Sequence, residues 1–144
     1  MLVQQILKEK GDEGVVTVQP GTLVQEAAKI LADRRIGTVV VSKTGKTADG
    51  IVSERDIVRE LGSRGAACMS DKVDDLMTSK LVTCTLSDDA VMVMEKMTEG
   101  RFRHMPVVEN GELLGLITLG DVVKARLTEL AMEKDALEGM IMGH

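Results

Sequence analysis

The stretch Gly50-Ile51-Val52-Ser53-Glu54-Arg55-Asp56-Ile57-Val58 decides the fold, because a second version of it stands 65 positions later. That version is Gly115-Leu116-Ile117-Thr118-Leu119-Gly120-Asp121-Val122-Val123. Each copy carries a glycine, two apolar residues, a serine or threonine, and an aspartate three residues after the hydroxyl. A repeat of this length is a supersecondary unit, and two such units usually pack against each other. The repeat therefore predicts two similar halves with two equivalent clefts.

The residues that flank each copy repeat as well. Val16-Thr17 returns as Val82-Thr83, and residues 33–41 return as residues 99–107, both 66 positions later. In each half a β-rich run precedes an amphipathic helical pattern, two further strand patterns and a second helix. We expect an α+β protein with the order βαββα twice, an N-terminal helix over residues 2–9 and a long C-terminal helix over residues 118–138.

Local signals predict where the helices begin and end. Thr22 is the expected N-cap of the leading helix of the first half, and Ser87 or Asp88 is the expected N-cap of its counterpart. Gly62 and Gly65 should end the second helix of the first half.

The remaining segments are predicted from turn and strand signals. Residues 81–85 are an expected strand that opens the second half, and residues 63–79 form the expected linker between the halves. Asn110-Gly111 is typical of a tight hairpin between two strands.

Composition limits the partners and the compartment. The 144 residues suit one compact domain or two small halves that share a core. The net charge of −5 and the interspersed acidic and basic residues argue against nucleic acid as the main partner. No apolar run reaches the length of a membrane span, and the N-terminus lacks the pattern of a signal peptide. Cys68 and Cys84 fit no metal or redox motif, so we expect buried thiols in a cytoplasmic protein.

The repeated motif resembles that of the CBS domain (cystathionine-β-synthase domain) in tandem, a pair often called a Bateman module. Residues 35–41, 52–56, 75–78 and 101–108 are similar to segments of small stand-alone prokaryotic CBS-pair proteins. The resemblance implies two βαββα units related by a pseudo-two-fold axis. Residues 1–70, with the N-terminal helix, would form the first CBS motif, and residues 71–144, with the C-terminal helix, the second.

The resemblance also implies an adenosine ligand, with AMP, ADP, ATP, NAD or S-adenosyl compounds as candidates. The family pattern assigns Asp56 and Asp121 to ribose hydroxyls, and Ser53 and Thr118 to phosphate or ribose. Arg55 of the first motif is matched by Gly120 of the second. If Arg55 meets phosphate, the two clefts are chemically unequal.

The same residues have a role that needs no ligand. A hydroxyl at the N-cap with a carboxylate three residues later forms a variant of the capping box, which stabilises a helix by about 1 kcal/mol. Ligand binding would add to this role, since a helix N-terminus offers free N–H groups and a positive dipole end to phosphate.

A basic segment precedes the second strand pattern of the second half. Arg103 can grip phosphate bidentately and His104 can add a hydrogen bond, although a solvated charge and a sheet-edge histidine are equally open readings. Main-chain groups of strand residues are expected to line the base pocket, with ordinary strand packing as the equal alternative. The remaining candidate ligand-binding residues are Thr17, Val18, Gly37, Thr38, Val39, Met105 and Pro106.

The leading functional hypothesis is a non-enzymatic sensor of adenine nucleotides that signals to a separate partner protein. No catalytic motif, metal site or catalytic cofactor is indicated. The alternatives are a ligand-free structural dimerisation module and, less favoured, an enzyme acting on nucleotides or a nucleic-acid binder. The apolar residues of the long C-terminal helix predict a homodimer, with residues 2–7 as a candidate part of the interface.

Overall fold

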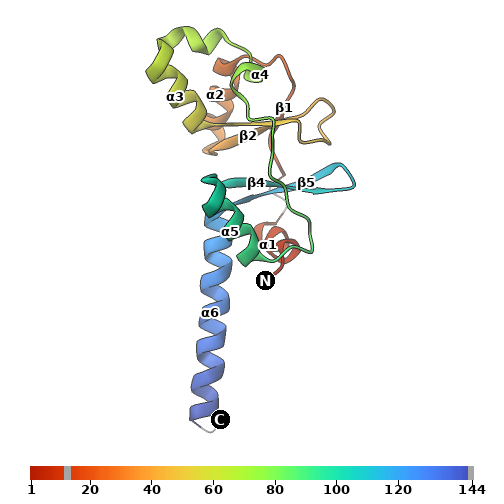
Figure 1. The fold of residues 1–144 in the computed structure, drawn as a ribbon, viewed down its shortest axis with the longest axis vertical. Coiled ribbons are helices and arrows are strands. Elements are labelled where there is room, and N and C mark those ends of the chain that lie inside the picture. The colour runs from red at the N-terminus through yellow and green to blue at the C-terminus, as the bar shows by residue number, and fades with distance from the viewer. Residues whose placement is uncertain (12–13, 143–144) are drawn as a thin grey trace.

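The two halves lie one above the other in the structure, a computed structural model that describes residues 1–11 and 14–142. Their strands face each other across the middle, and their helices cover the outside (Figure 1). The first half consists of β1 (Thr17–Val18), α2 (Val24–Arg34), β2 (Thr38–Val41), β3 (Gly50–Ser53) and α3 (Glu54–Arg64). The second half consists of α5 (Ala90–Gly100), β4 (His104–Glu109), β5 (Glu112–Thr118) and α6 (Leu119–Ile141). The predicted α+β class and the long C-terminal helix are thereby confirmed.

The two sheets share one plan, with one strand reduced. In the first half β1 pairs parallel to β2, and β2 pairs antiparallel to β3. In the second half β4 and β5 are antiparallel, and only a single parallel bridge, Cys84 to Val107, stands where β1 pairs in the first half. The predicted strand over residues 81–85 is therefore wrong. The bridge is nevertheless equivalent to the Val18–Val41 pair of the first half, because Cys84 and Val107 each stand 66 positions after their counterparts.

Several predicted helix ends move. Leu23, not Thr22, is the N-cap of α2, because the Thr22 hydroxyl donates to the carbonyl of Gln19 instead. Asp89 is the N-cap of α5 and accepts from the amide of Val91. Helix α3 continues through Gly62 and ends at Gly65, since a single glycine inside a helix costs only about 1 kcal/mol.

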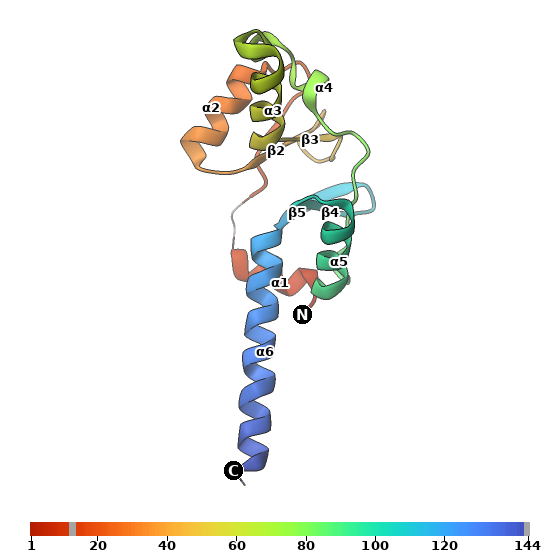
Figure 2. The same cartoon turned by 60° about the vertical axis from the view of Figure 1, so that its left-hand side comes forward.

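The expected linker between the halves contains a 3₁₀ helix η1 (Gly65–Ser70) and the short helix α4 (Val73–Leu76). Helix α4 packs on the first half, and the N-terminal helix α1 (Val3–Lys10) packs on the second half (Figure 2). The amide of Val73 donates to the carbonyl of Thr22, and the amide of Val3 donates to that of Asp88, in equivalent geometry. Each half is therefore completed by the helix that precedes the other half in the sequence.

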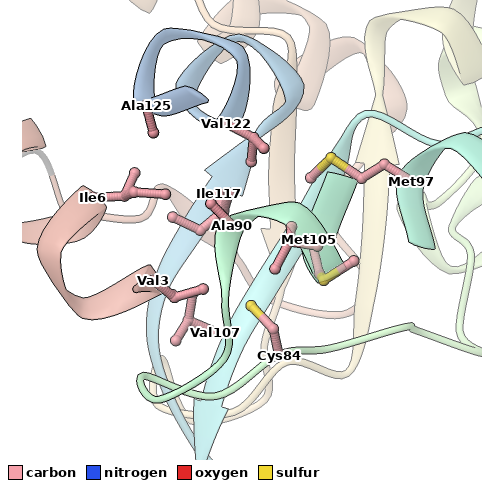
Figure 3. Packing of buried hydrophobic residues seen from close by; sticks show 11 residues of the cluster. Val3, Ile6, Cys84, Ala90, Met97, Met105, Val107, Ile117, Val122 and Ala125 are labelled. Carbon is pink, nitrogen blue, oxygen red and sulfur yellow. The ribbon is translucent and has the colours of Figure 1, made fainter. Parts of the chain in front are cut away.

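The buried clusters follow this exchange. Val3 and Ile6 of α1 lie in the cluster of the second half, among Ala90, Met105, Val107, Ile117 and Val122 (Figure 3). Val73 of α4 is fully buried in the cluster of the first half. The division into residues 1–70 and 71–144 stays a prediction about the sequence repeats, and hydrophobic packing crosses it in both directions.

The exchanged segments explain the glycine that opens each repeated motif. A Cβ at Gly50 would collide with the thioether of Met77, which follows α4. A Cβ at Gly115 would lie 2.7 Å from Cδ2 of Leu7 on α1. Both glycines leave room for an apolar side chain that comes from the exchanged segment.

Candidate functional site

The two repeated motifs lie at the starts of α3 and α6, where each forms a capping box. The Ser53 hydroxyl accepts from the Asp56 amide at 3.2 Å, and Oδ2 of Asp56 accepts from the Ser53 amide at 2.9 Å. Thr118 and Asp121 repeat this arrangement at 3.1 and 2.9 Å. The ligand-independent interpretation of the motif is therefore confirmed at both helices.

The residue just before β2 or β4 also holds the start of the helix in its half. The amide of Glu54 donates to the carbonyl of Gly37, and the amide of Leu119 donates to that of Arg103, both at 2.9 Å. These bonds set Gly37 and Arg103 beside the N-termini of α3 and α6. The halves are thus alike in backbone and differ in the side chain at this position.

A cavity of about 550 Å³ opens between the halves at the start of α3, and we call it the first cleft. This volume lies within the range of small-molecule sites. The first half contributes Gly37, Ile51, Ser53, Glu54, Arg55, Asp56 and Arg59. The segment after α4 contributes Thr78, Lys80, Leu81 and Val82, and the second half contributes Gly100, Arg101, Phe102, Arg103 and His104.

Positive charge dominates the first cleft, although the chain as a whole carries −5. Its acidic lining residues are Glu54 and Asp56, and its basic lining residues are Arg55, Arg59, Lys80, Arg101 and Arg103. Cations gathered beside a helix N-terminus favour an anionic ligand, since both the charges and the helix dipole attract it. The first cleft is therefore suited to phosphate.

Asp56 lines the first cleft, and its two carboxylate oxygens differ in their contacts. Its Oδ2 accepts from the amide and the hydroxyl of Ser53, whereas the nearest cation to Oδ1 is Nη1 of Arg59, at 3.8 Å. An ionised carboxylate with a free oxygen accepts hydrogen bonds from hydroxyl groups, including those of a sugar diol.

The equivalent carboxylate of the second half is occupied by a lysine. Nζ of Lys10 lies 2.8 Å from Oδ2 of Asp121 and also donates to the carbonyl of Leu116 at 2.9 Å. Burial by itself raises the pKa of Asp121, but the hydrogen bonds from Lys10 and Thr118 outweigh it and hold the pKa below its ordinary value. Asp121 lines neither the first cleft nor the groove beside α6 described next.

Thr118 faces a different hollow. A groove of about 790 Å³ runs along α6, and we call it the α6 groove. Its lining residues are Arg103, His104, Thr118, Leu119, Gly120, Val123, Lys124, Leu127, Thr128 and Ala131. Arg103 and His104 line both hollows, so the first cleft and the α6 groove meet at the start of β4.

His104 stands among charges of both signs. Burial lowers its pKa, Lys10 and Arg103 lower it further, and Glu54 and Asp121 act in the opposite direction. A histidine whose pKa is lowered from its ordinary value is mostly neutral at pH 7. His104 therefore offers a hydrogen bond and not a positive charge.

Six residues expected at the ligand lie in strands, outside the lining of both hollows: Thr17, Val18, Thr38, Val39, Met105 and Pro106. Thr38, which follows the cleft residue Gly37, is 4% exposed. Among residues 1–11 and 14–142, its hydroxyl is the one buried side-chain oxygen or nitrogen without a hydrogen-bond partner. Such an atom is costly unless something satisfies it.

Sequence reasoning missed Lys10 and Lys80, although a signal for both was present. Val3, Ile6, Leu7 and Lys10 recur 70 positions later as Val73, Leu76, Met77 and Lys80. Lys10 is the last residue of α1, and Lys80 stands at the equivalent position after the shorter helix α4. Lys10 reaches Asp121, whereas Lys80 lines the first cleft, and within the described residues no carboxylate lies within 4.0 Å of its Nζ. Glu54, Arg59 and Phe102 were also missed, since only the cavity brings them together.

Two further expectations concern the thiols and the membrane. Cys68 and Cys84 are both buried, and burial raises the pKa of Cys84 to about 12, so this thiol is unreactive at neutral pH. Across the described parts of the chain, none of the helices combines the length and the apolarity that crossing a bilayer requires.

Comparison with known proteins places this architecture. The sequence profile of the CBS domain matches residues 11–63 and 73–128. The CBS domain-containing protein CBSX3, mitochondrial, of Arabidopsis thaliana is 32% identical, over 98% of this chain and 72% of its own length. The CBS-domain containing protein ATU1752 of Agrobacterium tumefaciens is 44% identical with a TM-score of 0.82, over 88% of this chain and 99% of that protein.

Some of the similar structures carry a ligand. The CBS domain protein PAE2072 of Pyrobaculum aerophilum, complexed with AMP, is 28% identical with a TM-score of 0.77. It covers 92% of this chain and 99% of its own. Two matches to one domain profile, in the two halves that the structure shows, identify a tandem arrangement. The chain belongs to the CBS domain family, with two CBS motifs.

Proposed function

We propose that the first cleft binds an adenine nucleotide, and that the protein is a non-enzymatic regulatory module that signals to a separate partner protein. The observation that carries this proposal is the gathering of cations around the N-terminus of α3, beside a carboxylate with a free oxygen. The AMP complex of PAE2072 supports the same ligand class. AMP, ATP and NAD are the candidates, because each joins a ribose to phosphate.

The proposed binding mode assigns one part of the nucleotide to each group of residues. Oδ1 of Asp56 accepts from the ribose hydroxyls. The phosphate lies at the start of α3, within reach of Arg55 and of Arg103 across the cleft. His104 donates or accepts a hydrogen bond as a neutral imidazole. Thr38 and its neighbours in β1 and β2 back the base pocket through main-chain groups and apolar contact.

The two halves are proposed to bind unequally. Asp56 lines the first cleft, whereas Asp121 lines neither hollow and is ion-paired with Lys10, so Lys10 competes with a ribose for this carboxylate. One ligand per chain is therefore the expected occupancy. The proposed assembly is a homodimer, because exposed apolar residues continue along α6 after it leaves the second half.

A ligand-free structural module is the second candidate. The two capping boxes favour it, because they stabilise α3 and α6 without any ligand. In that case the first cleft would have no nucleotide affinity, and association through α6 would be the whole function.

Calorimetric titration with AMP, ATP, NAD and adenosine separates the two candidates. The wild-type protein is expected to bind at least one of the three phosphorylated ligands with about one site per chain, and to melt at a higher temperature in its presence. Asp56→Asn should weaken binding about tenfold or more, because the amide loses the carboxylate charge. Asp33→Asn, an exposed change on α2, is the matched control. If no ligand in this series binds the wild-type protein, the structural candidate replaces the sensor.

A further inference from the structure

Exposed apolar residues on α6 follow the spacing of a coiled-coil seam. Val123, Leu127, Leu130, Leu137 and Ile141 are all exposed, and steps of four and three residues separate them, with Lys134 filling the one polar position. A seam of this spacing keeps one helix face against a partner helix. Figure 1 and Figure 2 both show this part of α6 extending away from the two halves.

Lys134 lies within the seam and three charged residues lie beside it, and together they discriminate between the two possible orientations of a pair. In a parallel pair Lys134 would face Lys134 of the second copy, and Glu133 would lie beside Glu138 of that copy on both sides of the seam. In an antiparallel pair centred near residue 132, Lys134 faces Leu130, and Lys124 of each copy lies beside Glu138 of the other. The one remaining contact between like charges is that of Glu133 with Glu133 of the second copy. Charge complementarity therefore favours the antiparallel pair.

The antiparallel register also fills the α6 groove. It sets Leu137 of the second copy against Leu127, and Ile141 of that copy against Val123. Leu127, Val123 and Lys124 line the α6 groove, so the end of one α6 lies in the groove of the other. The apolar groove and the apolar helix end are then covered together.

We propose that two copies of this chain associate through an antiparallel pair of α6 helices, in which the end of each α6 occupies the α6 groove of the other. This inference rests on the self-association proposed above and is independent of nucleotide binding. Because Arg103 and His104 line both hollows, the partner's helix end lies next to the first cleft. The pair therefore gives the second copy a direct contact with the binding region.

Variants of the full chain that each add one exposed cysteine test the orientation by disulfide trapping. Leu127→Cys and Leu137→Cys are purified separately and oxidised alone or as an equal mixture. In the antiparallel pair each variant alone gives little cross-linked dimer, and the mixture gives a mixed disulfide. The wild-type protein is the background control, because Cys68 and Cys84 are buried.

Light scattering coupled to size exclusion tests the seam itself. Leu127→Glu buries an unpaired charge in the pair, so its dimer dissociation constant should rise about a hundredfold or more. Met132→Glu is the matched control, because Met132 is 64% exposed, Leu127 is 63% exposed, and Met132 lies on the opposite face of α6. The control should keep a mass near twice the 15.5 kDa of one chain.

Three results would overturn the inference, each in a recognisable way. A wild-type mass near 15.5 kDa over a hundredfold dilution series refutes self-association and the pair with it. A dimer in which each added cysteine cross-links to its own counterpart, with no second variant present, shows parallel helices. A dimer that forms no α6 cross-link and tolerates Leu127→Glu associates elsewhere. Nucleotide titration of the same samples reads out the first cleft separately from all three.

Discussion

Lys10 and Asp121 form a hydrogen-bonded ion pair at the position where, in the other half, Asp56 lines an open cleft. The pair joins α1 to the start of α6, and both side chains are less than a quarter exposed. The aspartate of the motif is thus ion-paired with a lysine in one half and lines a cleft in the other. This difference has consequences for occupancy, stability and pH dependence.

Removing the lysine should open the second motif. Lys10→Met keeps the apolar stem but frees Asp121, so the number of nucleotides bound per chain in calorimetric titration should rise from about one to about two. Lys8→Met is the control, because Lys8 is exposed on the same helix. A stoichiometry that stays at one in Lys10→Met would show that another feature closes the second motif.

The same variant should have a pH-dependent cost in stability. The folded pKa of Asp121 lies below its ordinary value of 3.8, so the ion pair stabilises the fold above that pH and loses its effect as the pH falls through the folded pKa. Lys10→Met should therefore lower the free energy of unfolding by about 1 kcal/mol at pH 6, and by less at pH 3. Urea titrations at both pH values measure the two differences. An equal loss at both would assign the effect to packing of the Lys10 stem.

Arg101 is expected to lower the stability of the fold while its charge contributes to nucleotide binding. Arg35 and Arg101 end α2 and α5 with positive φ angles of 53° and 55°, a conformation that favours glycine. Arg101→Gly should raise the melting temperature, because it relieves about 1 kcal/mol of backbone strain, yet weaken nucleotide binding several-fold by removing a cation from the first cleft. Arg35→Gly shares the backbone geometry but does not line the first cleft, so it should raise the melting temperature and leave the affinity unchanged.

The contribution of Arg55 depends on the phosphate of the ligand. Arg55→Gly copies the residue of the second motif and should weaken AMP binding more than adenosine binding, because only AMP carries the charge that Arg55 meets. Arg55→Gln, which keeps a good helix former at the start of α3, separates loss of charge from loss of helix stability. Equal losses of affinity for AMP and adenosine would mean that Arg55 acts through the fold.

Local rules predicted the elements of the fold well. Asn110 and Gly111 both adopt positive φ angles in the hairpin that their dipeptide indicates, and the capping boxes at Ser53 and Thr118 follow directly from the motif. Residues 81–85 do not form the predicted strand. An alternating sequence pattern does not show whether a neighbouring strand is available, and within this segment only Cys84 pairs with another strand.

The site was harder to predict, because it depends on contacts between the halves. The sequence indicated Arg55, Asp56, Arg103 and His104, all of which line the first cleft. It did not indicate that Lys10 reaches Asp121, more than a hundred positions away. The 70-position repeat of α1 and α4 carried that information, but its spacing differs from the 65 and 66 positions of the other repeats.

Because α1 and α4 are exchanged, the helix that completes each half lies at opposite ends of the two halves in the sequence: α4 follows the first half, whereas α1 stands far before the second. The two halves are therefore related as by a circular permutation. Residues 14–77 hold a complete first half with its covering helix, whereas the second half needs both ends of the chain. Cutting the chain at residue 70 would deprive each fragment of a helix that fills its core. The two halves should accordingly unfold in a single cooperative transition, and fragments that respect the sequence repeat should fold only when they are mixed.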